Sequence, residues 1–313
     1  MLSAKRHILA LFTLIILPGA TIYSQLPGVS SGKLIRHELF SSKKVANRNV
    51  DVWLPDGYSK QKKYAVLYMQ DGQMLFDSTN NWNKKEWQVD ETLGKLFREN
   101  KIRDCIVVGI WNTGEGRHAD YFPQKPFESL KKAEIDSVYM GNRQSGVSVF
   151  NGQKVRSDFY LKFIVEELKP FIDQEYSTMP DKANTFIVGS SMGGLISLYA
   201  ICEYPSIFGG AICMSTHWPG IFQVENNPFP AAFMKYLKMK LPSPRDHRIY
   251  FDHGEKTLDA WYAPFQRQVD AIMKQKGYKS GKNWITRFFP GEDHSENAWA
   301  RRFDFPVLFM LGK

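Results

Sequence analysis

Short runs of β-branched and aromatic residues, each bounded by glycine, proline or charged positions, recur along the chain. Runs of this length and composition are typical of strands. They predict eight strands, over residues 33–40, 49–54, 64–69, 105–110, 185–188, 210–214, 248–252 and 284–289.

Apolar residues spaced by three and four positions predict helices between the later strands. These helices cover residues 87–97, 160–168, 195–202 and 260–273. The third is apolar nearly all round and halts before Pro205, as expected of a buried helix. Two early strands followed by repeated strand–helix units predict an α/β fold in a single domain, with a mostly parallel central sheet and helices on both faces. Residues 112–156 and 215–244 lack this rhythm, and we expect them to form a wall or lid over a site.

The N-terminal residues have the pattern of a secretory signal. Lys5 and Arg6 precede an apolar run over residues 8–17, and small residues follow it up to Ser24. A helix that spans a bilayer needs about 20 apolar residues, so this run is too short to serve as one. The sequence therefore predicts a signal peptide over residues 1–24 and an exported domain over residues 25–313, periplasmic or secreted and without a membrane segment after cleavage.

The composition excludes several classes of protein. A hydrophobic fraction of 43% with 23% charged residues is typical of globular chains and not of disordered or fibrous ones. The net charge is +9, but the basic residues are scattered and no nucleic-acid-binding motif accompanies them, so we expect no nucleic-acid partner. Cys105, Cys202 and Cys213 lie in apolar stretches and are expected to be free and buried. No paired Cys or His stand at metal-ligand spacing, so neither a metal nor a cofactor is predicted.

One local segment carries the candidate chemistry. A buried strand runs into Gly189-Ser-Ser191-Met-Gly193, and a buried helix follows directly. A serine on such a sharp strand-to-helix turn exposes its hydroxyl above a helix N-terminus, where developing negative charge is stabilised. Ser191 is therefore the candidate nucleophile.

A serine hydroxyl needs a base, and that base needs an acid to hold it. When a serine occupies a turn of this kind, the partners follow in the order Ser, acid, His. His294 comes just after the last predicted strand and is the candidate base. The acid should follow the strand at 248–252, where we favour Asp259 and keep Glu255 as the alternative.

Acyl transfer also needs N–H donors aimed at the developing oxyanion. The backbone N–H of Met192 is the expected first donor, because it directly follows the nucleophile. Gly72 allows the loop after the third strand to turn its N–H groups toward the site, and we place the second donor at Gln73.

Four segments resemble a known family. They are Tyr68-Met-Gln-Asp-Gly-Gln73, Trp87-Gln-Val-Asp90, Val108-Gly-Ile-Trp-Asn112 with Arg117, and Gly189-Ser-Ser-Met-Gly-Gly-Leu195. Together they are similar to the α/β-hydrolase family that contains esterase D, siderophore esterases, feruloyl and acetylxylan esterases and mycolyltransferases. The resemblance implies a Ser–acid–His triad, which supports Ser191 and His294, and an oxyanion donor after Asp-Gly, which supports Gln73. The acid of this family varies between Asp and Glu.

The substrate is expected to lie against the two irregular stretches, with Gly72 as a further possible contact. Trp111, Asn112, His217 and Trp218 offer aromatic surface and hydrogen-bonding groups that suit a sugar or an aromatic acyl group. Alternatively, the two tryptophans are buried supports, and the same question arises for Trp82, Trp87 and Trp299.

These features predict an exported serine carboxylic ester hydrolase that forms an acyl-enzyme and removes acetyl or feruloyl groups from carbohydrate. The alternatives are a siderophore trilactone hydrolase, an acyltransferase and a catalytically silent carbohydrate-binding relative.

Overall fold

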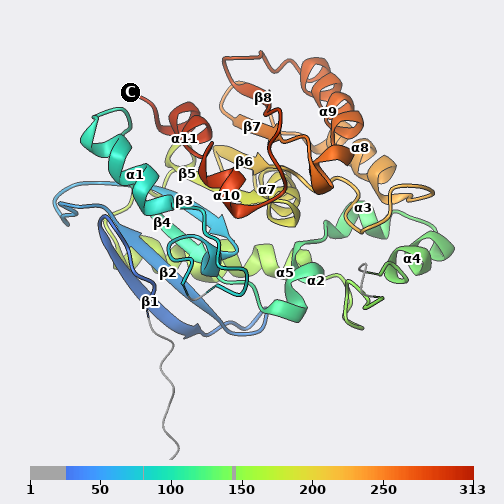
Figure 1. Cartoon of the computed structure of the whole chain (residues 1–313), viewed down its shortest axis with the longest axis horizontal. Helices are drawn as coiled ribbons and strands as arrows, with labels where there is room; N and C mark the ends of the chain where they lie inside the picture. The colour runs from blue at the N-terminus through green and yellow to red at the C-terminus, as the bar shows by residue number, and fades with distance from the viewer. Residues whose placement is uncertain (1–25, 80, 143–145) are drawn as a thin grey trace, which may run out of the picture.

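The computed structural model describes residues 26–79, 81–142 and 146–313. The predicted signal peptide lies outside these described residues. All eight predicted strands are present and pair in one sheet, in the order β1-β2-β4-β3-β5-β6-β7-β8 (Figure 1). Their bounds are β1 (Lys33–Phe40), β2 (Arg48–Leu54), β3 (Ala65–Gln70), β4 (Cys105–Ile110), β5 (Thr185–Ser190), β6 (Gly210–Met214), β7 (Arg248–His253) and β8 (Trp284–Phe288).

The sheet is mostly parallel, as predicted. Only the β1–β2 and β2–β4 pairs are antiparallel, and every other neighbouring pair is parallel. Every residue of β3, β4, β5 and β6 is buried, because helices cover both faces of the sheet. Because β3 to β8 are all parallel, their carboxyl ends lie at one edge of the sheet. This edge is where a site is expected in an open α/β sheet.

The helices that build the two layers lie at α1 (Val89–Arg98), α2 (Arg117–Tyr121), α3 (Gln124–Glu128), α4 (Lys132–Tyr139), α5 (Ser157–Lys162), α6 (Lys169–Glu175), α7 (Met192–Glu203), α8 (Phe229–Lys240), α9 (Ala263–Gln275), α10 (Glu296–Ala300) and α11 (Asp304–Leu311). One core cluster joins the sheet to α5, α7, α8 and α9. The other joins its opposite face to α1, α10 and α11, and α1 and α11 lie side by side (Figure 1). The α/β-hydrolase architecture with helices on both faces is thus confirmed.

The two stretches without predicted structure contain helices. Residues 112–156 hold α2, α3 and α4, and residues 215–244 hold α8. In α8 the buried positions Phe229, Phe233 and Leu237 repeat every four residues, but prolines at 228 and 230 obscure the pattern in the sequence. A proline in the first turn is compatible with a helix, since the N–H groups there have no intrahelical partner. The expectation of irregular structure in these stretches was therefore wrong.

The remaining compositional predictions can be compared with the described residues. Cys105, Cys202 and Cys213 are free and buried, as predicted. Within the described ranges, no group of His, Cys, Asp and Glu could hold a metal ion. No helix in those ranges is long and apolar enough to cross a membrane.

Candidate active site

Ser191 lies on a strained turn between β5 and α7. Its backbone φ is 55° and ψ is −123°, a combination that a residue with a Cβ rarely adopts. The turn is held by two hydrogen bonds, from Ser191 N to Met214 O (3.0 Å) and from His217 N to Ser191 O (3.1 Å). Gly189 has to be glycine, because a Cβ there would lie 2.4 Å from the carbonyl carbon of Gly193. The strand, turn and helix are therefore arranged as the motif predicts, with the serine half-buried at the sheet edge.

His294 and Asp259 are hydrogen-bonded to each other. The distance from His294 Nδ1 to Asp259 Oδ1 is 2.5 Å, and the His294 side chain keeps 10% exposure while the Asp259 side chain has none. Burial by itself would raise the pKa of Asp259, but the hydrogen bond and charge of His294, helped by Ser215 and the Gly254 N–H, lower it below its ordinary value. Asp259 is therefore a buried carboxylate, and it requires the hydrogen of the neutral His294 ring to be on Nδ1.

The structure separates the two candidate acids. Glu255 is exposed, and its carboxylate accepts from Gly291 N at 2.8 Å. Asp259 lies in the 3-10 turn Thr257–Trp261 that precedes α9, and its side chain caps no helix. Of the two carboxylates, Asp259 is the one that contacts His294.

A buried polar group behind Asp259 was not found from the sequence. Ser215 Oγ donates to Asp259 Oδ2 (2.6 Å) and accepts from Trp299 Nε1 (3.0 Å) and Arg302 Nη2 (2.7 Å). Arg302 also bonds Asp252 at 3.1 Å. These four residues come from three segments of the chain and hold the carboxylate in a single orientation.

Aromatic rings fix the plane of His294. Its ring lies between those of Tyr262 (centroids 5.7 Å apart, interplanar angle 73°) and Trp299 (5.1 Å, 85°), and both contacts are edge-to-face. Such pairs add about 0.5–1.5 kcal/mol each beyond the area that they bury. The imidazole is thus held by its neighbours even though it is partly exposed.

Tyr262 contacts both His294 and the buried His217. The Tyr262 hydroxyl is hydrogen-bonded to His217 Nδ1 (2.8 Å), and an interaction with the Ser191 side chain partly offsets the burial that raises the pKa of Tyr262. His217 Nε2 faces Ile221 O at 3.2 Å, and since a carbonyl can only accept, Nε2 carries the hydrogen and Nδ1 accepts from Tyr262. Burial, with the nearby charge of His294, lowers the pKa of His217 to about 3, so its ring is neutral. Among the described residues, no hydrogen bond joins the Ser191 hydroxyl to His294, whose side chain bonds Asp259.

The loop after β3 is braced next to the serine turn. Asp71 has a left-handed backbone (φ 56°), and its carboxylate binds Arg117 through two hydrogen bonds of 2.7 Å and Asn112 Nδ2 through a third of 2.7 Å. A Cβ on Gly193 would lie 3.4 Å from Asp71 Oδ2, so this loop and the start of α7 are neighbours. The N–H groups in the first turn of a helix have no intrahelical partner, which leaves those of Met192 and Gln73 available to a ligand.

The structure gives four of the predicted substrate-binding residues other surroundings. Trp218 is 1% exposed and packs against Phe233 and Phe251, so it belongs to the core. His217 is buried beneath Ser191 as described above. Asn112 braces Asp71, and Gly72 permits close approach to β4, because a Cβ there would lie 2.5 Å from Gly109.

Trp111 is also engaged elsewhere. Its Nε1 donates to Asp51 at 2.8 Å, and the Arg36 guanidinium lies over its ring at 4.6 Å. The predicted aromatic surface of Trp111 and Trp218 therefore faces the two-stranded edge of the sheet and the core, which matches the alternative that they are supports.

Comparisons with known proteins agree with this arrangement. The family model described as "Putative esterase" matches residues 41–310. The Bacillus subtilis protein "Uncharacterized protein YbbA" is 29% identical over 280 residues, which cover 87% of this chain and 96% of that protein. An "Endo-1,4-beta-xylanase/feruloyl esterase" of Xylanibacter ruminicola is 25% identical over 63% of this chain and 24% of its own length. A solved ferulic acid esterase has the same fold, with a TM-score of 0.60, 19% identity and coverage of 89% of this chain and 98% of that one.

The family match covers most of the chain, and the serine turn at the sheet edge lies within the matched residues. The protein therefore belongs to the Esterase family and is a carboxylic ester hydrolase with the α/β-hydrolase fold.

Proposed function

We propose that the protein is an exported serine esterase that removes acetyl or feruloyl groups from carbohydrate, with Ser191 as nucleophile, His294 as base and Asp259 as acid. The observation that carries the proposal is the placement of Ser191 on a strained turn beside Tyr262, whose ring packs edge-to-face against the imidazole of the His294–Asp259 pair. The apolar segment at residues 8–17 supports export.

The chemistry follows from the hydrogen positions. Asp259 holds the hydrogen of His294 on Nδ1, so Nε2 is free to take the Ser191 proton. When an ester enters, the serine hydroxyl donates to Nε2, and Oγ attacks the carbonyl carbon as its proton passes to the imidazole. The resulting imidazolium returns this proton to the departing alkoxide, which leaves an acyl-enzyme. Water then attacks the acyl carbon by the same proton route and releases the acid.

The oxyanion of each tetrahedral intermediate is proposed to lie between the N–H groups of Met192 and Gln73. Loss of one such donor costs about 10²–10³ in turnover in serine hydrolases. The Asp71–Arg117 pair positions Gln73 from below, because it fixes the left-handed residue at which the loop turns.

The exposed side chain of Trp82 is an argument for a carbohydrate or aromatic substrate. Its side chain is 87% exposed, and the neighbouring Asn83 donates to Glu296 Oε2 at 2.9 Å, two residues after His294. The exposed indole is therefore carried on a loop tied to the base, and it offers a flat face on which a sugar ring or a feruloyl group can stack. The partial match to a bifunctional xylanase and feruloyl esterase points to the same class of substrate.

A hydrolysis screen tests the proposal. Purified protein lacking residues 1–24 would be assayed on acetylated xylan, methyl ferulate, short aryl esters and a tris-catechol trilactone, beside Ser191→Ala and His294→Ala. We expect hydrolysis of the first three and a loss of several orders of magnitude in each variant without loss of folding. Cleavage of the trilactone alone, with a rate that falls steeply with salt, would instead identify a siderophore hydrolase. Acyl transfer to a sugar in place of water would identify a transferase, and no reaction with any ester a silent relative.

A further inference from the structure

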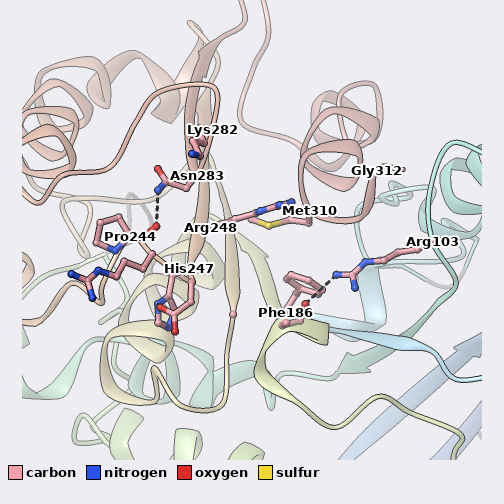
Figure 2. Close-up of a pocket in the computed structure, with 13 residues that line it drawn as sticks. Arg103, Phe186, Pro244, His247, Arg248, Lys282, Asn283, Met310 and Gly312 are labelled. Atoms are coloured by element: carbon pink, nitrogen blue, oxygen red, sulfur yellow. Dashed lines mark hydrogen bonds and ion pairs between the residues drawn. The ribbon is translucent and has the colours of Figure 1, made fainter.

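A cavity lies at the amino ends of the strands, opposite the serine turn. Its volume is about 470 Å³, within the range of small-molecule sites. Figure 2 shows Phe186 from the start of β5, Arg248 from the start of β7 and Met310 from α11 around it. Phe186 stands five residues before Ser191, and at about 3.3 Å per strand residue this separates the cavity from the serine by on the order of 15 Å. The cavity is therefore distinct from the candidate active site.

The lining carries an excess of positive charge. Four side chains are cationic: Arg103, Arg245, Arg248 and Lys282. The lining has one carboxylate, Asp246, and it already pairs with Lys182 and with His247 Nδ1 (3.0 Å).

Arg103 and Arg248 are held in place by neutral groups. Arg103 Nη2 donates to Ala183 O (3.0 Å), its other terminal nitrogen donates to the Asn184 side chain, and its guanidinium lies 5.5 Å from the Phe186 ring. Arg248 Nη1 donates to Phe309 O at 3.2 Å. In the part of the chain that the structure describes, neither guanidinium pairs with a carboxylate. Each uses only some of its five donors, so N–H groups remain on both.

The two guanidinium groups also repel each other. Burial, together with the charge of Arg248, lowers the pKa of Arg103. An anion between them would relieve this repulsion and accept paired N–H bonds, since guanidinium donors match the geometry of carboxylate and phosphate oxygens. The nearby Phe186 and Met310 side chains add apolar surface to the same cavity.

We propose that this cavity binds a small organic oxyanion, with its carboxylate or phosphate group between Arg103 and Arg248 and its apolar part on Phe186 and Met310. The cavity shares no residue with the proposed triad, so occupation is expected to stabilise the protein without being required for ester hydrolysis.

Thermal unfolding and calorimetric titration with phenyl phosphate, benzoate and inorganic phosphate test this proposal, with chloride at matched ionic strength as the reference. At ten times its Kd, phenyl phosphate is expected to raise Tm by about 2–4 °C over chloride. Arg248→Gln should weaken binding by about tenfold or more, and Arg103→Gln/Arg248→Gln should abolish it. The matched control Arg267→Gln/Lys274→Gln removes the same charge from exposed positions of α9 and should bind as the wild type does.

Three outcomes would overturn the proposal: no shift beyond that of chloride in the wild type, equal binding by the cavity variant and the α9 control, or inorganic phosphate binding as tightly as phenyl phosphate and benzoate. The shift over chloride is measured on the wild type alone, so its absence would refute the proposal even if the double variant fails to fold. Arg248→Gln should hydrolyse aryl esters at the wild-type rate, whether or not the anion binds. This result would distinguish the cavity from the active site.

Discussion

Ser215→Ala is the perturbation that most sharply tests the buried support of the proposed triad. The hydroxyl is fully buried and takes part in three hydrogen bonds, one given to Asp259 and two received from Trp299 and Arg302. Alanine removes the oxygen and leaves an indole N–H and a guanidinium N–H facing an apolar methyl group.

The cost in unfolding free energy follows from these hydrogen-bond partners. Hydrogen bonds to charged groups contribute about 1.5–3 kcal/mol and neutral ones about 0.5–1.5 kcal/mol. Arg302 keeps Asp252, and Asp259 keeps His294 and Gly254, so the losses do not simply add. We expect unfolding free energy to fall by about 3 kcal/mol and Tm by about 6 °C.

Catalysis should fall as well, because one of the groups that orient Asp259 is lost. We expect kcat on an aryl ester to decrease by about tenfold with KM unchanged, since the bond acts through the base and not on the substrate. Denaturant unfolding and steady-state kinetics at the same temperature measure the two effects separately.

Ser197→Ala is a matched control in α7. Its hydroxyl is also fully buried, but it donates only to Gly193 O at 2.7 Å. We expect it to cost about 1 kcal/mol and to leave kcat unchanged. If Ser215→Ala and Ser197→Ala have the same effect on stability and turnover, the polar support behind Asp259 has no special role and this reasoning is wrong.

Four further variants test other parts of the site. Asp259→Asn should reduce kcat by several orders of magnitude, while Glu255→Gln should leave it within about twofold, because only Asp259 contacts His294. Trp82→Ala should raise KM on acetylated xylan several-fold and leave aryl ester hydrolysis unchanged, because the exposed indole contacts only a large substrate. Thermal stability should fall as pH decreases from 6.5 toward 3. In this range His217 is protonated in the unfolded chain but stays neutral in the folded one, where its pKa is about 3, so protons bind preferentially to the unfolded state. His217→Asn should flatten that dependence, as followed by Tm against pH.

Each of these has a contrary result. If Glu255→Gln lowered kcat severely and Asp259→Asn only mildly, Glu255 and not Asp259 would be the acid. Equal losses on polymer and aryl esters in Trp82→Ala would make the indole a structural group. An unchanged pH dependence in His217→Asn would place the acid sensitivity in other buried groups.

The sheet and its serine turn were predictable because their signals are local. Strand β5 is an apolar run that meets Gly189, and the steric need for glycine there is written in consecutive residues. His294 and Asp259 followed from chain order relative to the last two strands, and the structure brings those two side chains into contact.

The support of the site could not be predicted from the sequence. Ser215, Tyr262 and Arg302 are chemically ordinary residues whose partners lie 44 and more positions away in the chain, as in the Ser215–Asp259 contact. Trp218 was expected to offer surface because it lies in a stretch without strand or helix periodicity, yet α8 folds over it and buries it. Burial of this kind depends on a helix that the prolines had hidden.

The most direct test of the central claim is labelling by a fluorophosphonate followed by intact mass and peptide mapping. We expect one phosphonyl adduct per chain, on Ser191, absent in Ser191→Ala and slowed by several orders of magnitude in His294→Ala, because only a serine whose proton is taken by an imidazole reacts at a useful rate. An adduct on another residue, or equal labelling rates in the wild type and His294→Ala, would contradict it.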